Sequence, residues 1–403
     1  MKVDGRQRVL RAYYLFRLIA PFVFSMWLTV VMLYFVTRIT DDPLQLAMLG
    51  VVLETATVLF EIPTGIVADV YSRKWSMVIG YVIWGIGFLI QGLIPIYPVV
   101  LVSQLIWGLG FTFVSGAPEA WLVDELGEDD AMPLFVRGSQ IGSISTLVGI
   151  LTATVLGTVD VALPIVMGGL GTIGLAILLG IVMPENGFKP IQRKQASRWG
   201  MFETFFDGVR EVRGQSVLRS VIMIGVVIGV SAGGFDALYT PHTVQDFTMP
   251  LFEPVIWFGI IYGGVMLLSI PALEVTKRYM TRNPQFPVAS VLAWFALGTI
   301  MGNLIFAWTG QFYMALLAYW VSQTLRNATK PLFMAWINQH TSSGVRATVI
   351  SMYWQSNGLG NIIGTPIIGA IGSLVSLRVA LTVTAIALSP VIPIYRKHRN
   401  DTR

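Results

Sequence analysis

The sequence lacks cysteine altogether and has few charged residues. Without cysteine, the 403-residue chain can form no disulfide and can supply no thiolate as a nucleophile or metal ligand. Charged residues make up 12% of the chain, whereas about 25% is usual for a soluble domain. Apolar residues reach 54%, and the mean hydropathy is +0.69. So few charges could not cover a globular surface of this size in water, and the composition therefore predicts that lipid surrounds most of the chain.

Histidine is also scarce, which argues against a metal-dependent or hydrolytic protein. The three histidines, His242, His340 and His398, lie too far apart along the chain to suggest a metal cluster. An intramembrane hydrolase needs paired His/Asp or Ser/His groups at catalytic spacing, and no such pair is apparent. The sequence also contains no Gly-x-x-x-x-Gly-Lys-Ser/Thr phosphate loop. We therefore expect neither an enzyme nor a receptor, and neither a cofactor nor a metal.

The sequence is instead rich in long apolar runs. A membrane-spanning helix needs about 20 mostly apolar residues, and twelve stretches meet this requirement. The first follows a basic segment but is too long for a signal peptide and lacks an Ala-x-Ala cleavage site, so it is expected to be retained. The expected spans are residues 13–36, 45–64, 76–94, 98–120, 138–158, 162–183, 219–240, 254–273, 287–308, 311–333, 347–370 and 377–394.

One long polar stretch divides these spans into six and six. It predicts an N-terminal six-helix bundle (1–183), a cytoplasmic linker (184–218) and a C-terminal six-helix bundle (219–403). The two halves also share weak sequence echoes. Arg137 opens the fifth span and Arg346 the eleventh, and each is followed twelve residues later by a glycine. Such echoes indicate internal duplication, as is typical of secondary transporters.

The distribution of Lys and Arg predicts the orientation of the chain, because cytoplasmic loops carry an excess of basic residues. If the N-terminus is cytoplasmic, 22 of the 27 basic residues lie on the inner side and only Arg38 and Arg378 in outer loops. We therefore expect a multi-pass protein of the plasma (inner) membrane with both termini in the cytoplasm. This asymmetry also accounts for the net charge of +5 without a nucleic-acid partner.

The loop after the second span carries a recognisable motif. Gly65, Asp69, Ser72, Arg73 and Lys74 follow the spacing Gly-x-x-x-Asp-x-x-Ser-Arg-Lys. This resembles the signature loop of the major facilitator superfamily, in which a second Gly stands where this chain has Ser. A small residue permits close helix approach, an acid can face the positive N-terminus of a neighbouring helix, and two cations can lie at the headgroups. The resemblance implies the major facilitator fold, an all-α integral membrane protein of twelve transmembrane helices in two pseudo-symmetric six-helix bundles.

The equivalent loop of the second half keeps the acid-to-arginine spacing, in Glu274 and Arg278, but loses the glycines. The resemblance implies that Asp69 and Glu274 latch an inner gate in the outward-facing state.

Further stretches are similar to the branch of the superfamily that contains tetracycline and macrolide exporters. They are Phe60–Gly65, Gly116–Asp124, Gly234–Tyr239, Ala335–Gln339 and the glycine-rich segment Arg346–Gly369. The similarity implies proton-coupled efflux of small amphipathic drugs. Two departures favour the alternative, an importer or facilitator of a metabolite or lipid-like solute without proton antiport. Gln104 stands where proton antiporters often carry Arg, and the fifth span lacks the antiporter motif Gly-Pro-x-x-Gly-Gly.

Charged side chains inside the spans need a reason, because each costs about 2.5–3.5 kcal/mol at the centre of the bilayer. The resemblance places helices one, four, seven and ten around the central path, so Asp236 on the seventh is expected to titrate protons or contact a cation. Arg326 and Lys330 lie four apart on one face of the tenth. They are expected either to pair with acids or to bind an anionic group of the substrate.

Three other charges are candidates with open roles. Glu54 on the second span is expected either to carry protons or substrate or to form an ion pair with Arg17 of the first, and Arg17 alternatively extends to the inner interface. Glu119, at the end of the fourth span, is expected to pair with basic inner loops at the gate. The expected partners of the chain as a whole are a small-molecule substrate, protons and the lipid bilayer, and it is expected to act as a monomer.

Overall fold

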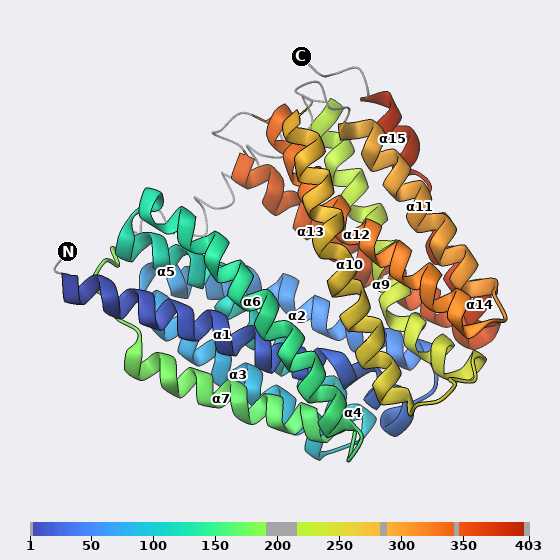
Figure 1. Cartoon of the computed structure of the whole chain (residues 1–403), viewed down its shortest axis with the longest axis horizontal. Helices are drawn as coiled ribbons and strands as arrows, with labels where there is room; N and C mark the ends of the chain where they lie inside the picture. The colour runs from blue at the N-terminus through green and yellow to red at the C-terminus, as the bar shows by residue number, and fades with distance from the viewer. Residues whose placement is uncertain (1–2, 191–215, 283–287, 342–345, 399–403) are drawn as a thin grey trace. The chain divides into compact units, whose positions relative to one another are not determined.

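The computed structural model describes residues 3–190, 216–282, 288–341 and 346–398, and within them every regular element is a helix (Figure 1). The elements are α1 (Val3–Tyr34), the π-helix η1 (Phe35–Ile39), α2 (Pro43–Val70), α3 (Arg73–Leu93), α4 (Tyr97–Val114), α5 (Ala117–Leu126), α6 (Glu128–Gly157), α7 (Leu163–Val182), α9 (Ser216–Asp246), α10 (Pro254–Arg282), α11 (Val288–Trp308), α12 (Phe312–His340), α13 (Arg346–Leu374), α14 (Leu377–Ala387) and α15 (Val391–Lys397).

In the described part of the chain these helices make up twelve membrane-length segments, at the places where the sequence predicts spans. Ten of the segments are long and apolar enough to cross a bilayer by length and composition alone. The other two, α12 and α13, are long enough but carry more polar residues, among them Arg326 and Lys330 on α12. The predicted all-helical, twelve-span architecture is therefore confirmed.

Two predicted spans differ from the prediction, since each is two helices rather than one. The fourth span breaks at Ser115 and Gly116, between α4 and α5. Gly116 has φ 73°, a left-handed conformation that only glycine adopts without steric cost. The twelfth span breaks between α14 and α15 at Pro390, which has no N–H to continue the helical hydrogen-bond ladder.

The chain forms two compact units, each described by itself. The first consists of Met1–Thr40, Val52–Gly200 and Val255–Gly259, and the second of Asp41–Val51, Met201–Pro254 and Ile260–Arg403. Residues 191–215 of the predicted cytoplasmic linker lie outside the described residues, so the predicted domain boundaries stay a prediction.

Helix pairing in the first unit depends on glycine. Helix α1 packs on α6 and α7, and α3 packs on α4 and α7. A Cβ at Gly149 of α6 would lie 2.6 Å from the carbonyl oxygen of Phe22 on α1, which is too close for any side chain. Small residues let the two backbones approach closely, and the resulting van der Waals packing helps to drive helix association in lipid.

The second unit repeats this pairing. Helix α9 packs on α13 and α14, and α11 packs on α12 and α14. A Cβ at Gly360 of α13 would lie 2.2 Å from the carbonyl oxygen of Val226 on α9. The first and fifth spans of the first unit, α1 and α6, thus meet in the same way as the first and fifth spans of the second unit, α9 and α13. This agrees with the predicted internal duplication.

Candidate functional site

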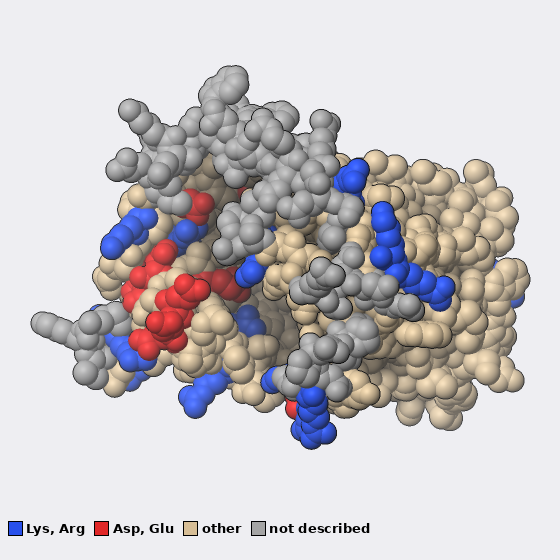
Figure 2. Space-filling model, turned by 90° about the horizontal axis from the view of Figure 1, so that it is seen from above, with Lys and Arg blue, Asp and Glu red and all other residues tan. Residues whose placement is uncertain are grey.

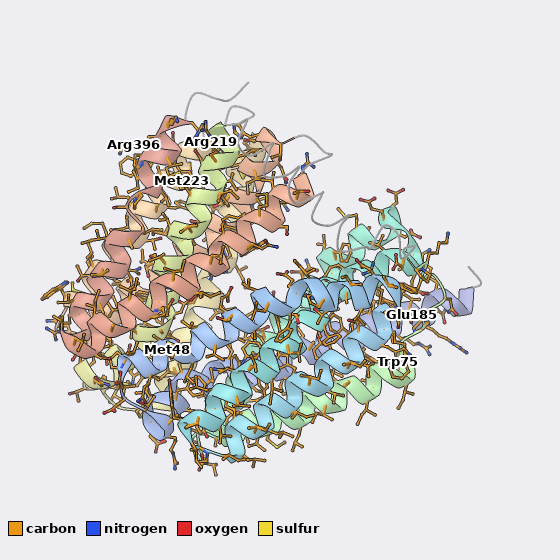
Figure 3. The ribbon with its side chains drawn as sticks, turned by 180° about the vertical axis from the view of Figure 1, so that it is seen from behind. Met48, Trp75, Glu185, Arg219, Met223 and Arg396 are labelled. Atoms are coloured by element: carbon orange, nitrogen blue, oxygen red, sulfur yellow. The ribbon has the colours of Figure 1, made fainter. Side chains whose placement is uncertain are left out.

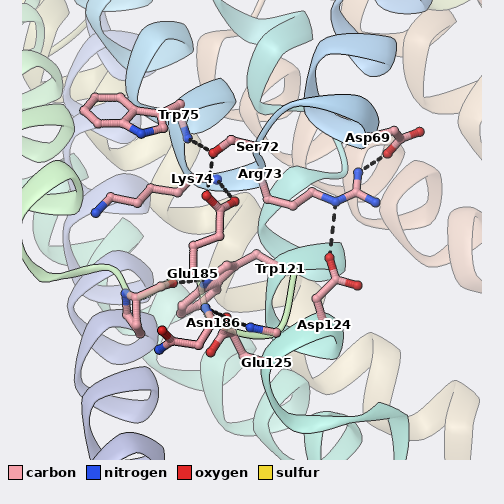
Figure 4. Close-up of polar contacts among 12 residues, drawn as sticks. Asp69, Ser72, Arg73, Lys74, Trp75, Trp121, Asp124, Glu125, Glu185 and Asn186 are labelled. Carbon is pink, nitrogen blue, oxygen red and sulfur yellow. Dashed lines mark hydrogen bonds and ion pairs between the residues drawn. The ribbon is translucent and has the colours of Figure 1, made fainter. Parts of the chain in front are cut away.

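The motif after the second span forms a connected polar cluster at one end of the first unit (Figure 4). Arg73 at the start of α3 pairs with Asp69 at the end of α2, and its Nε lies 3.4 Å from Asp124 Oδ2 on α5. Its side chain is only 16% exposed. Arg73 therefore joins the ends of three helices of the first unit, rather than lying free at the headgroups as the sequence suggested.

Ser72 caps α3 at the position where the superfamily motif has glycine. Its Oγ accepts a hydrogen bond from the backbone N–H of Trp75 at 2.9 Å and donates to Glu185 Oε2 at 2.6 Å. Glu185, which follows α7, also accepts from the backbone N–H of Lys74 at 2.9 Å. A carboxylate at this position stabilises the positive N-terminal end of α3. The acid that faces this helix N-terminus is therefore Glu185, and Asp69 binds Arg73 instead.

A buried glutamate extends the cluster along the segment after α7. Glu125 Oε1 on α5 accepts from the backbone N–H groups of Asn186 and Gly187 at 2.5 and 2.6 Å. Trp121 on the same helix donates from Nε1 to the carbonyl of Pro184 at 2.7 Å. These hydrogen bonds hold the segment 184–187, which follows α7, against helix α5. Trp75 and Glu185 lie together at this end of the unit (Figure 3).

The remaining predicted gate residues are more exposed. Glu119 lies exposed in the first turn of α5, and acidic side chains gather where α5 ends and α6 begins (Figure 2). Glu274 and Arg278 form an exposed ion pair within α10, with Oε1 and Nε 2.7 Å apart. The close helix approach expected at Gly65 is not found among the described residues, because no atom lies within 4 Å of a Cβ placed there.

Gln104 belongs to an aromatic cluster in the first unit. It is 3% exposed, and its Oε1 accepts a hydrogen bond from Trp107 Nε1. Trp107 stacks on Trp84 with ring centroids 5.5 Å apart and meets Trp27 edge-on at 5.1 Å. The position that carries a cation in many proton antiporters therefore holds an uncharged, hydrogen-bonded amide.

The structure does not bring Arg17 and Glu54 together. Arg17 Nε on α1 donates to the carbonyl of Gly138 on α6 at 3.0 Å. Glu54 is half-buried on α2 and forms no ion pair with any described residue. Of the two roles expected for Glu54, the pairing with Arg17 is thus not seen.

In the second unit Asp236 and Arg326 do meet. Arg326 on α12 donates from Nη1 and Nη2 to the two carboxylate oxygens of Asp236 on α9, at 2.6 and 2.7 Å. This two-pronged geometry is the strongest form of side-chain ion pair. Gln323 Oε1, one turn before Arg326, lies 3.4 Å from Nη1. The pairing expected for Arg326 is therefore present, and its partner is Asp236.

Arg326 and Lys330 line a cavity of about 190 Å³ inside the second unit. Helices α9, α11, α12, α13 and the last span contribute to its wall. Its polar lining comprises Ser231, Thr299, Asn303, Gln323, Arg326, Thr329, Lys330 and Asn357, and its aromatic lining comprises Phe235, Phe333, Tyr353, Trp354 and Tyr395. Polar and aromatic side chains around one cavity are typical of a small-molecule site.

The sequence profile of the Major Facilitator Superfamily matches residues 15–322, about three quarters of the chain. The chain belongs to the major facilitator superfamily. The protein is therefore a multi-pass membrane transporter that acts on small molecules. Its family and its fold are those of transporters, not of enzymes. The family assignment confirms the superfamily predicted from the loop motif.

Known proteins are similar to this chain at low sequence identity. The uncharacterized MFS-type transporter YxaM of Bacillus subtilis (strain 168) is 18% identical over 382 residues, 95% of this chain and 93% of the relative. A mutant of the nucleoside transporter NupG has a TM-score of 0.81 at 14% identity, covering 96% of this chain and 99% of that one. A bacterial homologue of the human lysosomal transporter Spinster gives 0.76 at 15% identity, covering 100% and 98%. The peptide transporter POT in complex with sulfate gives 0.73 at 12% identity, covering 98% and 95%.

Several contacts of the protein were not predicted. Glu185 could have been suspected, because it is an acid directly after the sixth span in a segment otherwise rich in basic residues. Asn303 and Tyr395 carry no such signal, since Asn303 is one polar group in an apolar run and Tyr395 follows the last predicted span. Only the packing of distant helices brings them to one cavity.

Proposed function

We propose that this protein is a secondary active transporter of the plasma membrane that exports small amphipathic compounds by alternating access in exchange for protons. The observation that carries the proposal is the Asp236–Arg326 ion pair beside the cavity of the second unit. A proton on Asp236 removes the negative charge that balances Arg326 and leaves an uncompensated cation. Proton binding at Asp236 therefore changes the charge of the cavity, which is what coupling to a proton gradient requires.

The direction of transport follows from resemblance. The stretches similar to tetracycline and macrolide exporters support export of drug-like compounds. The gate residues Asp69, Arg73, Lys74, Glu274 and Arg278 are proposed to act in the conformational change, and Glu119 with them.

The second candidate is uptake or facilitated exchange of a metabolite without proton antiport. The burial of the uncharged Gln104 within an aromatic cluster favours it, because a cation at this position belongs to the antiporter pattern. Transport that ignores a pH gradient would be its signature.

Uptake into proteoliposomes with an imposed pH gradient tests the choice. Cationic dyes, tetracycline-like, macrolide-like and small acidic compounds would be compared for wild type, Asp236→Asn and Glu54→Gln, with Glu253→Gln as the control at an exposed acid outside the helices. We expect gradient-driven accumulation in the wild type and the control and its loss in Asp236→Asn. Accumulation that is unchanged in both Asp236→Asn and Glu54→Gln, or insensitive to the gradient, would support the second candidate.

A further inference from the structure

A buried histidine lies near the end of α9, at the end of the second unit that the sequence assigns to the outer side of the membrane. The side chain of His242 is 0% exposed. The rings of Phe247 and Phe306 approach it edge-on, with centroids 5.2 and 5.1 Å from that of the imidazole. Its ring nitrogens therefore depend on partners within the protein, as buried polar groups generally do.

Both ring nitrogens of His242 face oxygen atoms that only accept hydrogen bonds. Nδ1 lies 2.8 Å from Asp246 Oδ2, one turn further along α9, and Nε2 lies 3.2 Å from the backbone carbonyl oxygen of Phe306 on α11. The Nδ1 contact lacks the direction of a normal hydrogen bond and is therefore mainly electrostatic. A neutral imidazole has one N–H, so one of its nitrogens presents a lone pair to an oxygen. The imidazolium presents an N–H to both.

The charges around His242 act in opposite directions. Asp246 favours a positive ring, and Arg378 on α14 opposes it while pairing with the same carboxylate, with Nε 3.3 Å from Oδ2. Helix α11 has no ionisable side chain, but Phe306 belongs to its last four carbonyl groups, the negative end of the helix dipole. Burial of the ring opposes its charge. Because these effects balance one another in part, we expect the ring to titrate between about pH 5 and 8.

From this geometry we propose that His242 is a proton-binding site at the predicted outer end of the second unit, separate from Asp236. In the neutral ring the charged Asp246 holds the single proton on Nδ1. A second proton enters on Nε2, which then donates to the carbonyl of Phe306 and links α9 to α11. Asp246 is 29% exposed and connects the buried ring with the aqueous side.

The site would make the packing of two helices depend on the outer pH. Helices α9 and α11 both line the cavity of the second unit, through Phe235 and Thr299 among others. Proton release from Nε2 removes the hydrogen bond between these helices without any change at Asp236. The proposal therefore holds whether or not Asp236 couples transport to protons.

Solid-state NMR of the full-length protein in lipid, labelled with ¹⁵N only at histidine, measures the protonation of each ring nitrogen. The chain has three histidines, and His242→Gln identifies the signals of His242 by their loss. We expect Nε2 of His242 to change from unprotonated to protonated as the pH is lowered from about 8 to about 5. A ring that keeps one proton, or two, over this whole range would overturn the proposal.

Two variants should move the midpoint of this titration in opposite directions, which a merely structural role would not do. Asp246→Asn removes the favourable charge and is expected to lower the midpoint by about one pH unit or more. Arg378→Gln removes the opposing charge and should raise it. Glu253→Gln, at an exposed acid outside the helices, is the control and should behave as wild type.

Midpoints that stay unchanged in both variants, or that move in the same direction, would also overturn the proposal. If Asp246→Asn does not fold, the upward shift in Arg378→Gln decides the question alone. The titration needs neither a substrate nor a gradient, so its outcome is independent of the proposed export.

Discussion

At the scale of single residues, Ser72 shows how a departure from a motif can be explained by its contacts. A glycine there would leave the first turn of α3 without a side-chain cap, whereas Ser72 accepts from the N–H of Trp75 and donates to Glu185. Serine is among the preferred N-cap residues. The substitution therefore keeps the turn and adds a link to the segment after α7.

Asp42 caps α2 in a similar way, and its contribution should depend on pH. Its Oδ1 accepts from Ser373 Oγ at 2.6 Å and from the backbone N–H of Leu44 at 2.7 Å. The hydrogen bond from Ser373 is the main reason that the pKa of Asp42 is lowered, with partial burial opposing it and backbone N–H groups assisting. A carboxylate with a lowered pKa in the folded state stabilises the fold above its ordinary pKa and loses this effect as the pH falls through the lowered value.

We therefore expect Asp42→Asn to reduce the melting temperature at neutral pH, and the difference from wild type to shrink as the pH falls below the ordinary aspartate pKa. Thermal unfolding of the detergent-solubilised protein over a pH series measures this difference. Asp41→Asn, at the exposed neighbouring acid, is the control and should show no such trend. A difference that stays constant down to the lowest pH would contradict the prediction.

At the scale of helices, α1 and α6 in the first unit, and α9 and α13 in the second, meet through glycine rather than through large side chains. Gly360 faces the backbone of Val226, and Gly149 faces that of Phe22. Interiors do not yield readily to added volume, and overpacking costs about 1–3 kcal/mol. The α9–α13 contact should therefore be sensitive to a single methyl group.

Gly360→Ala is expected to lower stability by about 1–3 kcal/mol, because its Cβ would lie 2.2 Å from a backbone oxygen that cannot rotate away. Gly174→Ala on α7 is the matched control, since nothing lies within 4 Å of its Cβ. There the better helix propensity of alanine should leave stability unchanged or slightly raised. Melting temperatures followed by size-exclusion chromatography after heating would compare the two. Equal melting temperatures for both variants would show that the helices can move apart at little cost.

At the scale of the whole molecule, the absence of cysteine makes the predicted orientation easy to test. Lys189, after α7, is predicted to be cytoplasmic, and Leu251, exposed between α9 and α10, is predicted to be outside. We expect a membrane-impermeant maleimide to label Leu251→Cys in intact cells but Lys189→Cys only after permeabilisation, because basic loops stay inside. The wild-type chain should not be labelled. The reverse pattern would overturn the orientation.

In the second unit, two basic residues from distant parts of the chain lie at one end. Arg219 on α9 and Arg396 on α15 lie at the same end of the second unit (Figure 3). Both belong to segments that the sequence assigns to the cytoplasmic side.

The class, the number of spans and the superfamily could all be predicted from the sequence. Each follows from local properties: apolar length, composition and a motif of five residues in one loop. The sequence also singled out Asp236, Arg326 and Lys330, because a charge in a long apolar run is conspicuous wherever the run packs.

Which groups meet could be read only from the packed helices. Asp236 and Arg326 are 90 positions apart and could be paired only once α9 and α12 were placed side by side. Arg17 donates a hydrogen bond to a backbone carbonyl of α6 instead of pairing with Glu54, and Arg73 pairs with Asp124. Asn303 and Tyr395 reached one cavity from two further helices. Side-chain partners depend on the geometry of distant helices, about which the periodicity of any single helix carries no information.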